Sequence, residues 1–501
     1  MRKNLISFFI ALLIFIMVFS NNHIFAETNT ESVSLPSFTV TLNGMEINNI
    51  YSKYPLIVYK DITYFPMTYA GCRYLGIETK WDEKTGLEID KTNVSYPYIS
   101  YDSNLKNAER YKTVTPKFNI KINGRTVDDQ NQEYPLLLFR DLTYFPLTWE
   151  YAVNEFGWDY HFDNKYGLVI NSQNVVPKEL KLPDYLSDEI YHSKGQFIVN
   201  GNFIYYAGNN GAIYKSSIDR PENNKKIFDV PLNYLFTDDT TYGYPYFEKR
   251  DGRVYFTYHL GGASMGTTYE VLINEDDTTS VPVHIGPYIG LPGPNKDGLL
   301  LNVAYDGNGY SHPTSTYETE NFKYVIGTDE KKPEEMSKVY KINKKTDEVT
   351  LVNEKYARWF KYYDGKLYFV SNDYKLYSIS LNNDTTELES NGPIEMPGKG
   401  NYEILGKEIY YINKSDGKIY KEGLTTPMNS GEQGIEISSF VDYVVLKFDS
   451  TVPDSYGTIV YSKDGKELLK TPNSMAIISS DINKMAYYDE KINKIFLIEL
   501  E

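Results

Sequence analysis

The sequence has little cysteine and little histidine, and it has no second long apolar run after its start. Cys72 is the only cysteine among 501 residues, so no intramolecular disulfide can form. The chain has six histidines, and no two of those after residue 26 are separated by a single residue. A chain without disulfides depends on its core for stability. Its length is enough for two or more domains with cores of their own.

Basic residues are scarce relative to acidic ones. Lys and Arg total 51 against 67 Asp and Glu, which gives a formal net charge of −16. Nucleic-acid binding requires a basic surface that neutralises phosphates, so this balance argues against nucleic acid as a partner. It also disfavours simple electrostatic attachment to anionic lipids or wall polymers. We interpret the acidic excess as a contribution to solubility.

The first residues have the pattern of an export signal. Arg2 and Lys3 precede an apolar run over residues 5–19, and Ile24-Phe25-Ala26 suits signal peptidase. The run is shorter than the ~20 residues that span a bilayer as a helix. We therefore predict a signal peptide over residues 1–26, with a retained membrane anchor as the alternative. The mature protein is expected to be secreted or cell-surface associated, without an integral membrane span.

One stretch occurs twice, displaced by 80 residues. The copies share Asn-Gly, Tyr-Pro-Leu and Thr-Tyr-Phe-Pro, at Asn43-Gly44, Tyr54-Pro55-Leu56, Thr63-Tyr64-Phe65-Pro66 and at Asn123-Gly124, Tyr134-Pro135-Leu136, Thr143-Tyr144-Phe145-Pro146. Asn-Gly between alternating segments predicts a tight hairpin. In the first copy a short helix over residues 67–75, starting after Pro66 and closed by Gly76, should come next. A last hairpin is expected from residues 77–81 and 87–89.

The second copy contains one extra residue in its helix. Leu75-Gly76 corresponds to Phe156-Gly157, at an offset of 81. One extra residue turns a helical face by ~100°, so we expect the two helices to present different side chains to their sheets. Residues 38–90 and 118–171 are predicted to form two small α+β modules, each an antiparallel sheet with one helix.

The repeated pattern resembles the copper amine oxidase N-terminal-like domain, a module of exported bacterial proteins. The resemblance implies a stalk-like or surface-associating role, and it does not imply oxidase activity. Copper amine oxidases hold copper with a His-x-His pair, because imidazole nitrogens suit copper, and this chain has no such pair after residue 26. Asn401-Tyr402-Glu403 matches the tripeptide around their quinone precursor, but the expected upstream threonine is missing.

The remainder of the chain is rich in tyrosine and in short alternating segments. A linker with Pro177 and Pro183 is expected over residues 172–184. Hairpins of the type Gly-x-x-Ile-Tyr-Tyr followed by Gly-x-Ile-Tyr recur every 40–50 residues, which is typical of an all-β propeller. We predict six or seven blades over residues 185–501, with residues 495–498 pairing a strand near 189–192. This region resembles a propeller-like domain of unknown function found beside such stalk repeats in secreted bacterial proteins.

Three patterns are possible sources of chemistry. Residues 262–266 have the spacing of a nucleophile elbow around Ser264, but a strand rather than a helix is predicted to come after them. Residues 306–309 begin like a calcium loop and lack the closing ligands. His259, His284 and His312 could converge, although exposed or hydrogen-bonded histidines are commoner than metal ligands. We therefore predict no catalytic, cofactor-binding or metal-binding residue, and no cofactor.

Two functions fit this sequence. The first is a non-catalytic binding protein in which stalk modules present a propeller to an extracellular protein or a cell-wall glycan. Its contact surface is predicted on the long loops 260–266, 286–296 and 306–321. The alternative is a propeller-based hydrolase or lyase that acts on an extracellular polymer. That alternative predicts carboxylates or histidines with perturbed pKa values converging at the propeller axis.

Overall fold

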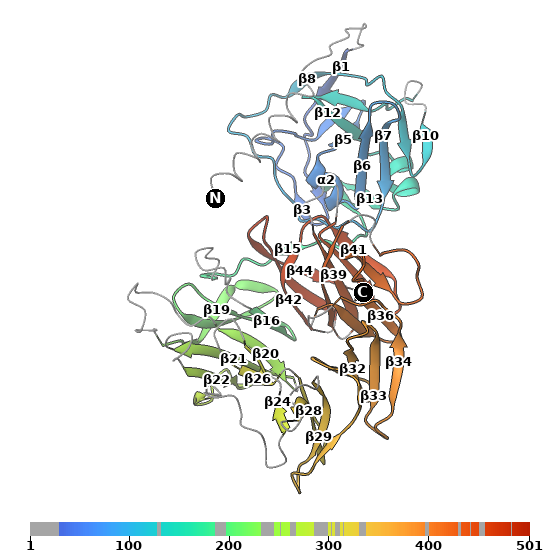
Figure 1. The fold of residues 1–501 in the computed structure, drawn as a ribbon. Helices are drawn as coiled ribbons and strands as arrows, with labels where there is room; N and C mark the ends of the chain where they lie inside the picture. Colours follow the sequence, from blue (N-terminus) through green and yellow to red (C-terminus); the bar gives the residue numbers. More distant parts are fainter. Residues whose placement is uncertain are drawn as a thin grey trace, which may run out of the picture. The chain divides into compact units, whose positions relative to one another are not determined.

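The computed structural model divides the chain into two compact units (Figure 1). Unit 1 comprises Met1–Thr92 and Tyr98–Gln173, and unit 2 comprises Asn93–Pro97 and Asn174–Glu501. The structure describes residues 30–127, 132–185, 197–231, 245–250, 252–260, 267–284, 299–301, 303–305, 311–313, 315–329, 337–395, 400–428, 432–440, 442–449, 456–481 and 483–500. The predicted signal peptide lies outside these residues. No helix among them is both long and apolar enough to span a membrane.

Unit 1 is built around a closed barrel of six strands, of which each repeat contributes two and the segment just before each repeat contributes one. The barrel order is β1-β4-β5-β12-β11-β8. Its strands are β1 (Thr30–Ser34), β4 (Ile57–Tyr59), β5 (Ile62–Pro66), β8 (Arg110–Val114), β11 (Leu137–Phe139) and β12 (Leu142–Pro146). The two Tyr-Phe-Pro stretches pair with each other, with Phe65 opposite Phe145. The doubled motif therefore forms the antiparallel strand pair that joins the two repeats within the barrel.

Two further sheets of unit 1 are also shared between the repeats. The last hairpin of repeat 1 joins the first hairpin of repeat 2 in the order β10-β9-β7-β6, and the reciprocal sheet is β13-β14-β2-β3. Their strands are β2 (Val40–Leu42), β3 (Met45–Glu46), β6 (Ile77–Asp82), β7 (Gly86–Lys91), β9 (Ile120–Ile122), β10 (Arg125–Val127), β13 (Asp159–Asp163) and β14 (Gly167–Asn171). The two exchanged pairs, β7·β9 and β14·β2, are parallel.

The prediction of two separate α+β modules is therefore wrong. Both repeats contribute to every sheet of unit 1, so neither repeat can bury its hydrophobic face alone. The only helices in the described residues are α2 (Tyr69–Tyr74) and η2 (Glu150–Glu155), of six residues each. Pro66 ends β5 instead of starting the helix, and the side chain of Thr68 caps α2 by accepting a hydrogen bond from the amide of Gly71. Unit 1 is an all-β structure with two short helical turns.

The extra residue of repeat 2 is absorbed by a π-helical turn. In η2 the amide of Phe156 donates to the carbonyl of Tyr151, five residues earlier, over 3.0 Å. A single π turn accommodates one inserted residue without rotating the residues that come after it. Leu75 and Phe156, which close the two helices, are both fully buried. The expected mismatch of about 100° between the helices is thus absent at their C-terminal ends.

The Asn-Gly turns have a second role that joins the repeats. Asn43 and Gly44 have φ angles of 47° and 79°, as the predicted tight turn requires. The side chain of Asn43 donates to the carbonyl of Tyr74 and accepts from the amide of Ser172 at the end of β14. Asn123 makes the equivalent contacts in repeat 2, with the carbonyl of Glu155 and the amide of Lys91. Each turn therefore links a helix of its own repeat to a strand of the other.

Unit 2 contains seven antiparallel sheets of three to five strands in its described residues. Each sheet is made of strands that are consecutive in sequence, except that the third skips a small separate hairpin and the seventh includes one strand from the start of the unit. The first two sheets are β16 (Phe197–Asn200), β17 (Phe203–Ala207), β18 (Ala212–Ser217), β19 (Arg220–Asp229), and β20 (Tyr246–Arg250), β21 (Arg253–Leu260), β22 (Thr267–Ile273), β23 (Val283–His284). The third contains β24 (Leu299–Leu301), β27 (Thr316–Glu318), β28 (Phe322–Asp329), β29 (Lys338–Asn343) and β30 (Val349–Leu351). A separate small hairpin is formed by β25 (Val303–Tyr305) and β26 (Ser311–Pro313).

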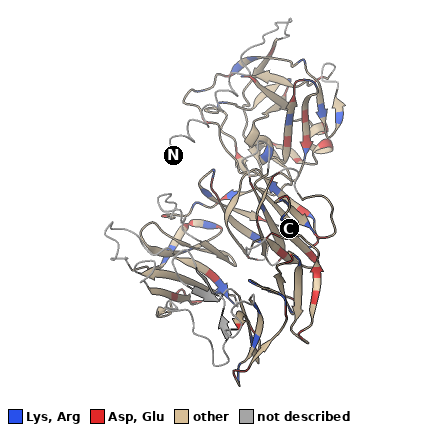
Figure 2. Cartoon of the chain, in the orientation of Figure 1, with Lys and Arg blue, Asp and Glu red and all other residues tan. Residues whose placement is uncertain are grey.

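The last four sheets are arranged in the same manner. They are β31 (Lys361–Tyr363), β32 (Lys366–Val370), β33 (Leu376–Ser380), β34 (Thr386–Ser390); β35 (Tyr402–Leu405), β36 (Glu408–Ile412), β37 (Ile419–Lys421); β38 (Gly434–Phe440), β39 (Tyr443–Phe448), β40 (Thr458–Ser462), β41 (Glu467–Thr471); and β42 (Met475–Asp481), β43 (Lys484–Asp489), β44 (Lys494–Glu499) with β15 (Lys178–Glu179). Acidic and basic residues are scattered over these strands, and β34 (Thr-Glu-Leu-Glu-Ser) carries acidic ones (Figure 2).

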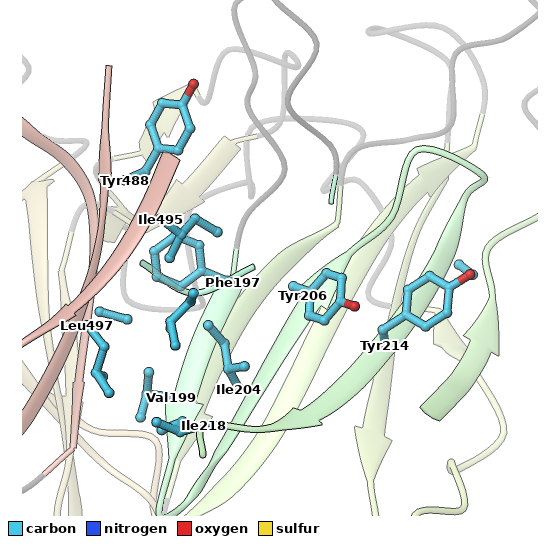
Figure 3. Packing of buried hydrophobic residues seen from close by; sticks show 12 residues of the cluster. Phe197, Val199, Ile204, Tyr206, Tyr214, Ile218, Tyr488, Ile495 and Leu497 are labelled. Atoms are coloured by element: carbon cyan, nitrogen blue, oxygen red, sulfur yellow. The ribbon is translucent and has the colours of Figure 1, made fainter. Parts of the chain in front are cut away.

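Buried apolar clusters join six pairs of sheets in unit 2, and one of them joins the seventh sheet to the first. In that last interface, Phe197 and Val199 of β16 lie against Ile495 and Leu497 of β44 (Figure 3). Similar apolar clusters join the first sheet to the second. Others join the third sheet to the fourth, the fourth to the fifth, the fifth to the sixth and the sixth to the seventh. An all-β series of sheets in this order, with its last sheet packed on its first, is compatible with a β-propeller.

The strand that completes the seventh sheet comes from the stretch expected to be a linker. Lys178 and Glu179 of β15 pair with Leu497 and Phe496 of β44. The strand expected for this role, near residues 189–192, lies outside the described residues. The inter-repeat residues Asn93–Pro97 also belong to unit 2, where Val94 pairs in parallel with Lys470 at the end of β41.

Candidate functional site

Two tyrosine rings stack at the junction of the third and fourth sheets of unit 2. Tyr317 of β27 and Tyr362 of β31 have ring centroids 4.0 Å apart and planes inclined by 12°. Tyr362 is 45% exposed, whereas Tyr317 is half-buried against the core shared by these sheets. The ring of Tyr362 is thus accessible to solvent, and it stacks on the ring of Tyr317, which packs against the core.

The local sequence explains how the stack is held. Tyr317 lies opposite Tyr324 of β28, whose side chain is fully buried. The hydroxyl of Ser315 accepts a hydrogen bond of 2.9 Å from the amide of Phe360, so the residues before β27 are tied to the start of β31. Because side chains alternate along a strand, Tyr362 points away from the face that carries Lys361 and Tyr363.

The two phenols also interact electrostatically. Hydrogen bonding to Tyr362, with a smaller contribution from burial, raises the pKa of Tyr317 to about 12. The Tyr317 hydroxyl therefore remains protonated at neutral pH and can donate or accept hydrogen bonds. An aromatic face beside hydroxyl groups suits a ligand that is both ring-shaped and rich in hydroxyls.

The stack lies in one of the three loops predicted as a contact surface. Tyr317 belongs to the 306–321 stretch, of which residues 311–313 and 315–321 are described. Of the 260–266 loop only Leu260 is described, and the 286–296 loop lies outside the described residues. Ser264 of the elbow pattern and the calcium-like residues 306–309 also lie outside the described residues. Tyr362 was not predicted, because nothing in the sequence brings β31 beside β27.

A second group of polar residues lies on the first strands of the fourth, fifth and sixth sheets. Glu403 of β35 forms an ion pair with Lys361 of β31, and its other carboxylate oxygen accepts from the hydroxyl of Ser439 on β38 over 2.9 Å. The Glu403 side chain is only 14% exposed. Burial raises the pKa of its carboxyl, although Lys361 opposes the shift. Both carboxylate oxygens of Glu403 are therefore engaged between sheets.

Glu436 continues this group toward the seventh sheet. Lys447 of β39 donates to Glu436 of β38 over 2.8 Å and to the carbonyl of Ala476 on β42 over 3.2 Å. Burial disfavours the charged form of the Glu436 carboxyl, but the hydrogen bond and charge of Lys447, together with Ser438 and Lys361, outweigh burial and lower its pKa. The carboxyl pKa is thus raised at Glu403 on β35 and lowered at Glu436 on β38. Such opposite shifts occur in acid–base catalytic sites, and they also occur in structural ion pairs.

The remaining sequence candidates are placed separately. Tyr402, of the Asn-Tyr-Glu tripeptide, is buried and donates to the carbonyl of Tyr368 over 2.8 Å, so it is a core residue. Nδ1 of His259 lies 3.1 Å from the hydroxyl of Thr268. The ring of His284 lies 6.0 Å from that of Tyr269. Within the described residues, no three His, Cys, Asp or Glu side chains are grouped as a metal site would require.

Comparison with known proteins assigns no family. No protein-family model and no curated protein sequence matches the chain. Among solved structures, the computationally designed Ika8 protein matches 64% of this chain and 99% of its own, with 12% identity and a TM-score of 0.39. A protein of unknown function from Bacteroides thetaiotaomicron matches 96% of this chain and 100% of its own, with 13% identity and a TM-score of 0.29.

BamB from Moraxella catarrhalis is a third structural match. It covers 61% of this chain and 82% of its own, with 9% identity and a TM-score of 0.27. Likenesses of this size carry no functional argument.

Proposed function

We propose that the protein is an exported, non-catalytic binding protein, in which unit 2 is a seven-bladed β-propeller that recognises an extracellular glycan. The observation that carries the proposal is the Tyr317–Tyr362 stack, with its exposed ring and protonated hydroxyl. Aromatic faces bind the apolar faces of sugar rings, while phenol hydroxyls pair with sugar hydroxyls. The export signal predicted over residues 1–26 supports an extracellular location.

The test is retention of the full chain on isolated cell walls and on a glycan array. We expect Tyr362→Ala to lower retention at least tenfold, because the exposed half of the stack is lost. Tyr246→Ala is the matched control, since Tyr246 is 56% exposed on β20 and belongs to another sheet. If wild-type protein is not retained by any glycan, or if both variants are retained as strongly as wild type, the glycan proposal is abandoned.

A hydrolase or lyase remains the second candidate, and one observation favours it. Glu403 and Glu436 have oppositely shifted pKa values on the first strands of neighbouring sheets, where a propeller axis would lie. This alternative predicts release of reducing ends or unsaturated products from cell-wall polymer, and loss of that release in Glu403→Gln. Absence of any product from the wild-type protein would eliminate it.

A further inference from the structure

The side chain of Arg73 on α2 is buried without an acidic partner. It is 5% exposed, and its guanidinium carbon lies 3.6 Å from the centre of the Tyr69 ring, one turn earlier on the helix. Its Nη1 donates a long hydrogen bond of 3.4 Å to the carbonyl of Tyr69. Among the described residues, no ion pair includes Arg73. Buried arginines are rare unless they are paired, so the partner that usually accompanies such a residue is missing here.

One edge of this guanidinium has no acceptor. A guanidinium has five N–H donors, and the carbonyl of Tyr69 accepts from one of those of Arg73. Nε is enclosed by protein and has no hydrogen-bond partner in the described part of the chain. Burial of an unpaired charge costs far more free energy than one contact with an aromatic ring returns. An acceptor that bridges Nε and the neighbouring Nη2 would complete the site.

The architecture of unit 1 does not require a cation at this position. The two helical turns begin alike, because the hydroxyls of Thr68 and Thr148 each accept a hydrogen bond from the amide three residues later. At the same offset of 80 residues, the position of Arg73 is taken in repeat 2 by Val153, which is half-buried. An apolar side chain therefore suffices for packing at this point of the fold. Binding explains an arginine at residue 73 better than packing does.

The shape and charge of the free edge indicate the ligand. The N–H bonds of Nε and Nη2 are parallel, and they match the two oxygens of a carboxylate. A carboxylate carries one negative charge, which balances one guanidinium, whereas a phosphate monoester carries about −1.5 to −2 at neutral pH. Since so little of Arg73 is exposed, the carboxylate must lie at the end of a small molecule. The ring of Tyr69, which is 45% exposed, covers one face of the guanidinium.

We propose that Arg73 binds the carboxylate of a small organic acid through Nε and Nη2, with the ring of Tyr69 as one wall of the site. Val153 cannot form such bonds, so repeat 2 has no equivalent site and unit 1 binds one carboxylate. This binding is separate from the proposed recognition by Tyr317 and Tyr362 in unit 2.

The experiment is thermal unfolding of the full chain, followed by tryptophan fluorescence, in sodium acetate and in sodium chloride of the same ionic strength. We expect acetate to raise the unfolding midpoint of the wild-type protein more than chloride does, and the difference should grow with acetate concentration. Arg73→Met should abolish this difference. Arg73→Lys should weaken the apparent affinity about tenfold, because an ammonium keeps the charge but cannot form two parallel hydrogen bonds. Without acetate, Arg73→Met should be at least as stable as wild type, since it removes an unpaired buried charge.

Arg125→Met is the matched control, since Arg125 belongs to the same unit and its side chain is 70% exposed. This variant and Tyr362→Ala should respond to acetate as the wild type does, whichever way the test of unit 2 turns out. Binding is also measured directly, as magnetisation transfer from the protein to the methyl protons of acetate by NMR, which Arg73→Met should abolish.

Four results would overturn the proposal. They are an equal response of wild type and Arg73→Met to acetate, no transfer from the wild type to acetate, a larger rise of the wild-type midpoint in phosphate than in acetate, and a marked loss of stability in Arg73→Met without acetate. The last result would show that the guanidinium serves the fold alone.

Discussion

Alanine at Gly86 should destabilise unit 1 far more than alanine at Gly44. Both glycines have positive φ angles, 87° and 79°, so both substitutions carry the strain of a left-handed alanine, about 1–2 kcal/mol. At Gly44 an added Cβ would meet nothing within 4 Å. At Gly86 it would lie 2.0 Å from the carbonyl oxygen of Asn119, which belongs to the other repeat. Backbone atoms cannot rotate away as a side chain can.

The magnitude depends on the groups that the added methyl group displaces. Moving Asn119 breaks its hydrogen bond from the amide of Leu87, a loss of about 0.5–1.5 kcal/mol. It also disturbs the parallel pairing of β7 with β9, which begins at Leu87 and Ile120. We expect Gly86→Ala to cost about 3 kcal/mol or more, against about 1–2 kcal/mol for Gly44→Ala. The difference between these two costs measures how much the close packing of one repeat's strands on the other contributes to stability.

The assay is urea unfolding of the full chain followed by tryptophan fluorescence. Three of the four tryptophans, Trp81, Trp149 and Trp158, lie in unit 1, so the signal reports mainly on that unit. The comparison can be repeated in the second copy, where a Cβ on Gly167 would lie 2.0 Å from the carbonyl of Thr39 and one on Gly124 would meet nothing. If Gly86→Ala and Gly44→Ala cost the same within about 0.5 kcal/mol, the exchanged architecture is refuted.

Three further outcomes are expected from the structure. Asn43→Ala should cost about 1–2 kcal/mol in the same urea assay, because the carbonyl of Tyr74 and the amide of Ser172 lose a partner, and Asn48→Ala should cost less. Tyr402→Phe should cost about 1–2 kcal/mol of unit 2 stability by thermal unfolding, because the carbonyl of Tyr368 is left without this donor, and an unchanged midpoint would contradict that role. Burial raises the pKa of the Asp489 carboxyl above its unfolded value near 3.9, so between these two pKa values the folded state binds more protons than the unfolded state. Unit 2 should therefore gain stability as the pH falls through the folded pKa toward about 3.9. Asp489→Asn should flatten this gain, and an identical pH profile would exclude Asp489 as its source.

Local structure in unit 1 was largely predictable from the sequence, whereas the pairing of its strands was not. The Asn-Gly turns and the hairpin of β6 and β7 can be expected from residue type and alternation, and both are present. The exchange escaped prediction because the copies are so alike. The edge that β9 offers to β7 has the same apolar-polar-apolar pattern as the edge that β2 would offer, Ile-Lys-Ile against Val-Thr-Leu. A pattern cannot distinguish pairing within a repeat from pairing between repeats.

Unit 2 shows the same limit in another form. Its hairpins were predictable, since Ile-Tyr-Tyr segments around glycine turns alternate clearly, and β17–β18, β32–β33 and β36–β37 are present. The closing strand β15 was mistaken for linker, because two residues between prolines carry too little pattern. For the candidate site, the loop around Tyr317 could be singled out from its length and aromatic content. Its partner Tyr362 depends on long-range packing that no local signal records.

The placement of Asn93–Pro97 in unit 2 has a consequence for the order in which the protein can be completed. Val94 and Ser95 are buried, and the amide of Ser95 donates to the carbonyl of Lys470 over 2.8 Å. These partners are separated by 375 residues in the chain. At the roughly 5–20 residues per second of protein synthesis, the earlier segment waits on the order of 20–75 s for its partner. The segment between the repeats is made early and reaches its final contacts among the last.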